Sequence, residues 1–109
     1  MAKYLVQANF IAEGFKGLLK EGGSKRRDVV EKAAISMGGS LEAIYYAFGE
    51  VDAYVILNMP DHASMVALAL TVGASGAVVI KTTVLMTPEE IDDAIENLPT
   101  YRPPGKKNI

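Results

Sequence analysis

The order of strand-like and helical stretches is the strongest constraint on the fold of this chain. Four stretches carry the apolar, β-branched and aromatic residues typical of strands: residues 3–11, 41–48, 51–58 and 77–86. Only Gly49 and Glu50 separate the second from the third, which predicts a hairpin with a two-residue turn; the alternative is a longer loop. Helical patterns precede and follow this hairpin. The order predicts an α+β fold, βαββαβ, in which a four-stranded antiparallel sheet carries its helices on one face.

The helical stretches are marked by their spacing and by signals at their ends. Ser24 and Asp61 each precede a stretch with apolar residues at helical spacing, and each is a predicted N-cap. A shorter helical pattern lies before Ser24. Thr87, Pro88 and Glu90 have the spacing of a capping box with proline at the first helical position. These signals predict helices on either side of the hairpin and a last helix after the fourth strand.

Length and charge narrow the classes of protein. The chain has 109 residues and a formal net charge of −2. We expect one domain over residues 1–98 and an extended tail over residues 99–109, which contain two adjacent prolines. The charge balance argues against nucleic-acid binding, and the one basic cluster, residues 25–27, is predicted to be the solvated start of a helix. The longest apolar run, residues 65–80, is too short to span a membrane.

The absence of cysteine from the sequence removes further chemistry. Disulfides, thiolate catalysis and cysteine-based zinc sites are excluded. The chain has a single histidine, and no spaced set of histidine and carboxylate residues predicts a metal site. We therefore expect a cytoplasmic protein with neither a metal nor a cofactor.

Helices on one face of a four-stranded sheet leave the other face bare. At period two, Tyr45 and Leu57 fall on one side of the hairpin, and Tyr54 and Ile56 fall on the other, so both sides are apolar. A monomer would expose roughly several hundred Å² of contiguous apolar surface, more than soluble monomers usually leave open. The pattern predicts a homo-oligomer, a dimer or larger, in which two sheets pack face to face. The alternative is a monomer whose bare face binds an apolar ligand.

Two polar residues are candidates for catalysis. His62 follows the predicted cap Asp61, and a neutral imidazole there can act as a base or a haem ligand; the alternative is an exposed first-turn residue. Asp52 can orient a substrate or act as a base, or it can accept backbone N–H groups at the hairpin. Asp52 and Glu42 are also candidate partners for Lys81, whose charge lies within an apolar strand and needs water, a cavity or an acid.

Ligand contacts are predicted for four residues. Asn9, Tyr46 and Tyr54 are candidates to line a cavity between the sheet and the helices, although aromatic side chains in sheets more often serve the core or an interface. Lys81 is the fourth candidate, and for it an interface ion pair is favoured over a catalytic amine.

A string of short motifs resembles a known family. The motifs, in chain order, are Asn9-Phe10, Gly38-Gly39, Gly49-Glu50-Val51-Asp52, Pro60-Asp61, the alanine- and leucine-rich residues 67–76, and Thr87 before an acidic helix. Together they cover about residues 3–98 and resemble the GYD-domain family, which takes its name from a Gly-Tyr-Asp signature. Gly49 and Asp52 match that signature, and Val51 occupies the position of the tyrosine.

The resemblance implies a ferredoxin-like fold of the dimeric α/β-barrel kind. That superfamily holds cofactor-free monooxygenases, haem-handling enzymes, isomerases of small molecules and proteins of unassigned function, so the fold alone does not fix the activity. The leading hypothesis is a small homo-oligomeric binding or accessory module of unassigned function, and a small apolar ligand is a candidate partner. The alternatives are a cofactor-independent monooxygenase or isomerase with a pocket near Asp52, His62 and Tyr54, and a haem-binding protein that uses His62.

Overall fold

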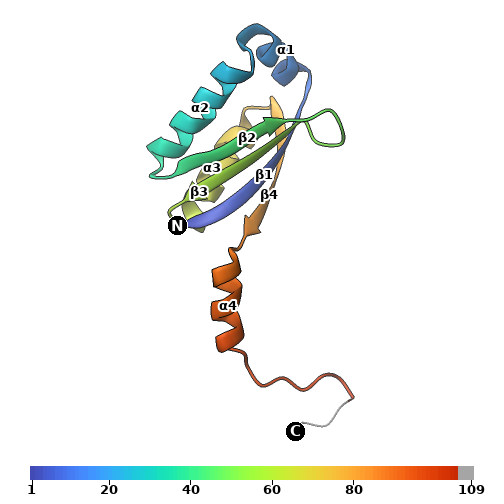
Figure 1. Cartoon of the computed structure of the whole chain (residues 1–109). Coiled ribbons are helices and arrows are strands. Elements are labelled where there is room, and N and C mark those ends of the chain that lie inside the picture. Colours follow the sequence, from blue (N-terminus) through green and yellow to red (C-terminus); the bar gives the residue numbers. More distant parts are fainter. Residues whose placement is uncertain (106–109) are drawn as a thin grey trace.

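A computed structural model describes residues 1–105 of the chain (Figure 1). The last residues of the predicted tail, 106–109, lie outside the described residues. The elements, in chain order, are β1 (Ala2–Phe10), α1 (Ala12–Glu21), α2 (Gly23–Ser36), β2 (Ser40–Tyr46), β3 (Ala53–Met59), α3 (His62–Ala74), β4 (Val78–Leu85) and α4 (Pro88–Glu96).

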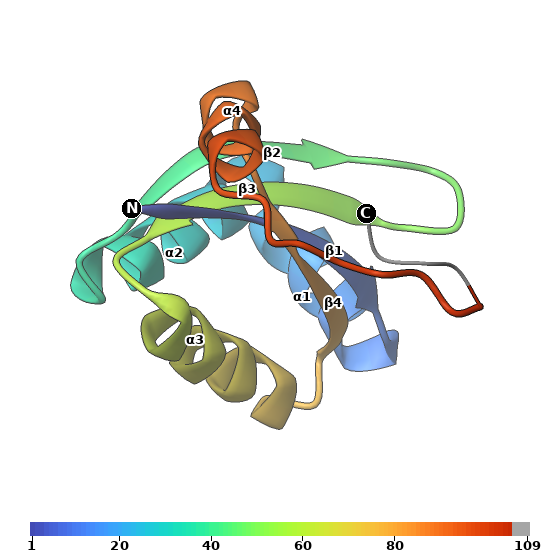
Figure 2. The ribbon, with the colours of Figure 1, turned by 90° about the horizontal axis from the view of Figure 1, so that it is seen from below.

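The four strands form one antiparallel sheet in the order β2-β3-β1-β4. Residue Val6 of the central strand β1 lies between Val55 of β3 and Thr82 of β4. Helices α2 and α3 lie on the same side of the sheet (Figure 2). This arrangement confirms the predicted α+β, ferredoxin-like fold with one helix-covered face.

The hydrophobic core lies between this inner face and the two helices. Alternate residues of β1 and β3 point inward, as period-two patterning requires, and they meet apolar residues of α2 and α3. The buried cluster comprises Tyr4, Val6, Ala34, Val55, Leu57, Met59, Met65 and Leu68. Gly39, between α2 and β2, belongs to the same packing, because a Cβ there would stand 2.4 Å from the carbonyl oxygen of Asn58.

The edge strand β2 departs from strict alternation. A bulge between Leu41 and Ala43 shifts its register against β3, so that Leu41 pairs with Leu57 and Ile44 pairs with Val55. Leu41 and Ile44 therefore both pack against the core, although they are three positions apart in the sequence. Strict period-two alternation would place them on opposite faces of the strand.

Two local predictions from the sequence are wrong. The hairpin connection spans residues 47–52 and is not a two-residue turn, because the Asp52 N–H bonds to the carbonyl of Ala8 on β1 at 3.0 Å. Ser24 lies inside the first turn of α2, because Gly22, with φ of 83°, both ends α1 and takes the N-cap position. The other N-cap is confirmed, since the Asp61 side chain accepts from the Ser64 N–H at 2.8 Å.

Helix α4 stands apart from the sheet. It begins with the predicted capping box, in which Thr87 and Glu90 exchange hydrogen bonds. It then projects from the end of β4, away from the other helices (Figure 1), and leaves Ile91, Ile95 and Leu98 exposed. Among the described residues, no helix combines the length and the apolar character needed to cross a bilayer.

Candidate functional site

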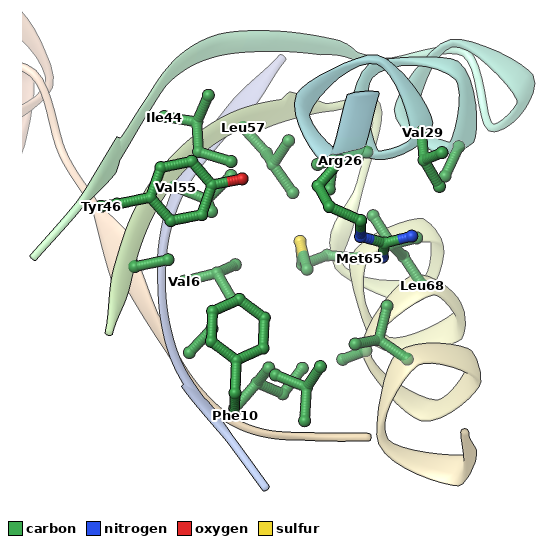
Figure 3. A pocket seen from close by; sticks show the side chains of 18 residues that line it. Val6, Phe10, Arg26, Val29, Ile44, Tyr46, Val55, Leu57, Met65 and Leu68 are labelled. Atoms are coloured by element: carbon green, nitrogen blue, oxygen red, sulfur yellow. The ribbon is translucent and has the colours of Figure 1, made fainter. Parts of the chain in front are cut away.

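An apolar cavity of about 150 Å³ lies between the inner face of the sheet and the helices α2 and α3 (Figure 3). Helix α2 packs over the edge strand β2, whereas α3 packs toward β4. The two helices therefore stand apart over the central strands β1 and β3, which supply the floor. The lining includes Val6, Ala8, Phe10, Ala53, Val55 and Leu57 from the sheet, Val29, Val30 and Ala33 from α2, and Met65, Leu68, Ala69 and Val72 from α3.

Small side chains create the free space. Four alanines line the cavity, on β1, β3, α2 and α3, where larger residues would fill it: Ala8, Ala53, Ala33 and Ala69. The cavity reaches the surface at the end where Val29 and Tyr46 lie, because these side chains are 41% and 37% exposed. These two residues therefore mark the mouth of the cavity.

Two polar side chains stand among the lining residues at this mouth, Arg26 and Tyr46. The Tyr46 hydroxyl donates to the carbonyl oxygen of Gly23 at 3.1 Å, which fixes the ring beside the start of α2. Burial raises the pKa of Tyr46 above its ordinary value of 10.0, and the charges of Arg26 and Arg27 partly oppose this rise. The Arg26 guanidinium has Glu21 as a partner, with Nη1 and Oε1 3.5 Å apart.

Asn9 and Asp52 lie where the hairpin loop meets β1 and do not line the cavity. The Asp52 carboxylate accepts from the backbone N–H of Phe10 at 2.9 Å, and the Asn9 side-chain oxygen accepts from the Asp52 N–H at 3.1 Å. These reciprocal bonds tie the loop to β1. Asp52 therefore makes the contacts expected of a structural residue, because its carboxylate accepts a backbone N–H beside the hairpin.

His62 lies beyond the other end of β3, in the first turn of α3. Its Nδ1 forms a hydrogen bond with the hydroxyl of Tyr4, whose ring is buried and meets the imidazole edge-on. Burial raises the pKa of Tyr4 above 10.0, and the nearby Asp61 carboxylate raises it further. His62 contributes with Val66 and Val84 to a second hollow, which lies on the other side of Met65 and Ala69, residues that also line the cavity.

Tyr54 and Lys81 both lie on the bare outer face. Tyr54 pairs with Gln7, and Gln7 pairs with Lys81, so the three form one row across β3, β1 and β4. The structure therefore does not bring Asp52, His62 and Tyr54 into one pocket, because they occupy the two ends of β3 and its opposite face. Within residues 1–105, Lys81 forms no ion pair.

Glu42, a predicted partner of Lys81, is engaged elsewhere. The bulge in β2 turns its carboxylate toward Lys3 and Asn58, with which it forms an ion pair and a hydrogen bond. The hydrogen bond from Lys3 lowers the pKa of Glu42 below its ordinary value of 4.5. This pair joins β2 to β1 across β3 on the outer face.

A family model shows where the chain belongs. The model of the GYD domain matches residues 4–95, from β1 nearly to the end of α4. The chain belongs to the GYD domain family. A search among curated proteins finds no match to this chain.

In this GYD domain, the residues at the signature positions shape the hairpin loop. Gly49 and Asp52 lie at the end of the sheet where β2 and β3 meet, and Val51 has no hydroxyl to offer a ligand. The Asp52 carboxylate accepts a hydrogen bond from the backbone of β1. Within residues 1–105, no group of three or more histidine, aspartate or glutamate side chains is placed to hold a metal ion.

Sequence reasoning missed Arg26, which it placed on the solvated side of a helix. The signal was present, because Val29, Val30 and Ala33 follow Arg26 at i+3, i+4 and i+7, the spacing of a single helix face. All four of these residues line the cavity. Arg26 therefore begins the helix face that lines the cavity, and this position could have been read from the spacing.

Proposed function

We propose that this GYD domain is a homo-oligomeric binding module whose cavity takes a small, mainly apolar molecule. The observation that carries the proposal is the apolar cavity of about 150 Å³ that opens beside Tyr46. In another protein, an engineered apolar cavity of about this size stays dry and binds benzene. A single ring or a short branched chain is therefore the size of ligand that fits.

Binding is favoured over catalysis by the chemistry of the lining. Among the described lining residues, the polar side chains are Arg26 and Tyr46, and neither a carboxylate nor an imidazole is present. A cofactor-independent monooxygenase or isomerase needs a group that accepts a proton within reach of its substrate. Asp52 and His62 hold backbone and tyrosine partners outside the cavity instead.

The haem hypothesis has weaker support. A porphyrin is much larger than a cavity suited to a single ring, and His62 does not line that cavity. Haem uptake with a Soret band that His62→Ala abolishes would nevertheless restore this hypothesis.

A second copy of the chain is the occupant that we propose for the outer face. Leu5 of β1 pairs with Ile56 of β3 at the centre of that face, and both are half-buried. Lys3 at one end is already paired with Glu42, which leaves the apolar centre without an opposing charge. A self-complementary patch of this kind suits a two-fold pair of sheets. We also propose that the protein is cytoplasmic.

Cavity-filling variants test the binding proposal. Ala33→Leu and Ala69→Leu place larger side chains in the cavity without loss of helix propensity. Ala67→Leu, on an exposed position of α3, is the matched control. We expect uncharged single-ring compounds such as benzyl alcohol to bind the unaltered protein and Ala67→Leu, and not the two filled variants, by ligand-observed NMR. Equal binding by all four proteins would place the ligand elsewhere and refute the proposal.

A further inference from the structure

Arg26 is the one cationic side chain among the described residues that line the cavity. It extends from the first turn of α2 into the space between α2 and α3, on the side where Met65 also lies (Figure 3). Its side chain is 34% exposed, so it is neither fully solvated nor enclosed. A positive charge beside an apolar space has lost part of its water and gains from an anionic partner.

The guanidinium keeps hydrogen-bonding capacity for such a partner. Arginine has five N–H donors, whereas the one polar contact of this side chain within residues 1–105 is Nη1 to Glu21 at 3.5 Å, the long end of the hydrogen-bond range. Glu21 lies in the last turn of α1, outside the lining of the cavity. The donors that face the cavity are therefore available to a bound molecule.

The start of α2 adds partial positive charge beside Arg26, opposite in sign to the Glu21 carboxylate. Within the described residues, no side chain caps the start of α2, so N–H groups of its first turn remain near Arg26. Tyr46 points its hydroxyl at the carbonyl of Gly23 in the same turn and screens that oxygen from the mouth. Arg27 lies nearby but does not line the cavity, and its guanidinium has Asp28 as a partner, with Nε and Oδ1 3.5 Å apart.

We propose that the cavity selects small carboxylic acids, and that Arg26 is the residue that binds the acid group. The inference rests on the proposed binding function and narrows its ligand class. The apolar walls accept a ring or a short branched chain, and the planar guanidinium matches a carboxylate with two parallel hydrogen bonds. Because one cationic side chain lines the cavity, we expect the ligand to carry one negative charge.

Matched ligands and matched variants test this preference. Benzoate and benzamide have the same ring and nearly the same shape, and only the former is charged. In calorimetric titrations at neutral pH and low salt, we expect benzoate to bind about tenfold or more tightly than benzamide, because hydrogen bonds to a charged group are the stronger kind. Arg26→Gln should remove this preference, because it should weaken the binding of benzoate far more than that of benzamide.

Two further variants separate charge from geometry. Arg27→Gln removes the same charge one residue away from the cavity lining and should keep the preference. Arg26→Lys keeps the charge without the planar fork, and we expect a smaller preference for benzoate. Two-dimensional NMR spectra of each variant show that the fold is retained.

The outcomes distinguish the two proposals. Equal binding of benzoate and benzamide by the unaltered protein, or an equal loss of both ligands in Arg26→Gln, would overturn the acid preference and leave the apolar binding function standing. Binding of neither compound by the unaltered protein would overturn both.

Discussion

The two faces of the sheet are made by the same strands and differ in almost everything else. Leu57, on the inner face, is 2% exposed, whereas Tyr54, on the outer face of the same strand, is 38% exposed. The inner face is covered by α2 and α3, and the outer face, seen in the described residues, is covered by nothing. Alternate residues of one strand therefore have separate surroundings, since one set forms the core and the other set forms the face on which we propose that a second copy packs.

The inner face is itself unevenly filled. Beneath α2 and α3 the side chains interlock in a buried cluster, whereas between the helices the alanines leave a cavity. Close packing gives stability, and the missing packing between the helices gives room for a ligand. Five residues belong to both the core cluster and the cavity lining: Val6, Val55, Leu57, Met65 and Leu68. Substitutions at the alanines and on the outer face can nevertheless separate stability from the binding and the association that we propose.

The largest effect is expected in the core. Leu57→Ala leaves a void beside Tyr4 and Met59, and this should lower the free energy of unfolding by about 2–5 kcal/mol. Leu70→Ala, at a position on α3 that is 68% exposed, is the matched control and should change it by less than about 1 kcal/mol. Urea denaturation measures both. Similar losses of unfolding free energy at the two positions would mean that buried and exposed leucines do not differ in their contribution to stability.

A charge at the centre of the outer face should act on association instead. Ile56→Asp places a carboxylate where the second copy would pack, and we expect it to weaken association by about a hundredfold or more, or about 3 kcal/mol. Val66→Asp, on the exposed side of α3, is the control. Sedimentation equilibrium measures the change. A concentration-independent monomer in the unaltered protein would refute the oligomer, and an unchanged Ile56→Asp oligomer would move its interface elsewhere.

The sheet and its helices were predictable because their signals are local. Alternation in β1, the N-cap Asp61 and the capping box at Thr87 depend on neighbours in sequence, and the structure confirms them. The hairpin was predicted too short, because its length depends on the bond between Asp52 and Ala8, which are distant in sequence. The bulge in β2 was missed for the same reason.

The site was harder to predict, because a cavity is defined by what several elements leave unfilled. No spacing within one element shows that α2 and α3 stand apart over Ala8 and Ala53. Of the four predicted ligand contacts, the structure places Tyr46 at the cavity and Asn9, Tyr54 and Lys81 away from it. Polar residues attract attention in a sequence, whereas the alanines that create the space do not.

A smaller effect is expected when Asp61, the side chain that caps the start of α3, is replaced. The side-chain and backbone hydrogen bonds from Ser64 lower the pKa of Asp61 below its ordinary value of 3.8. A carboxyl group with a lowered folded pKa stabilises the fold above its ordinary pKa, and this stabilisation is lost as the pH falls through the lowered value. The Tm advantage over Asp61→Ala should therefore hold at neutral pH and narrow below pH 3.8. Asp92→Ala, an exposed carboxylate on α4, should show no such trend.

The smallest effect should follow removal of α4, which belongs to neither face. A chain that ends at Met86 loses the helix with Ile91 and Ile95, whose side chains are 45% and 59% exposed and lie outside the core cluster. Because no buried contact is lost, the free energy of unfolding should change by less than about 0.5 kcal/mol. Thermal and urea unfolding, together with sedimentation, measure this. A clear loss of stability or of association, repeated by Ile95→Gln in the full chain, would show that α4 covers part of the outer face in solution, and that face would then be less bare than the single chain shows.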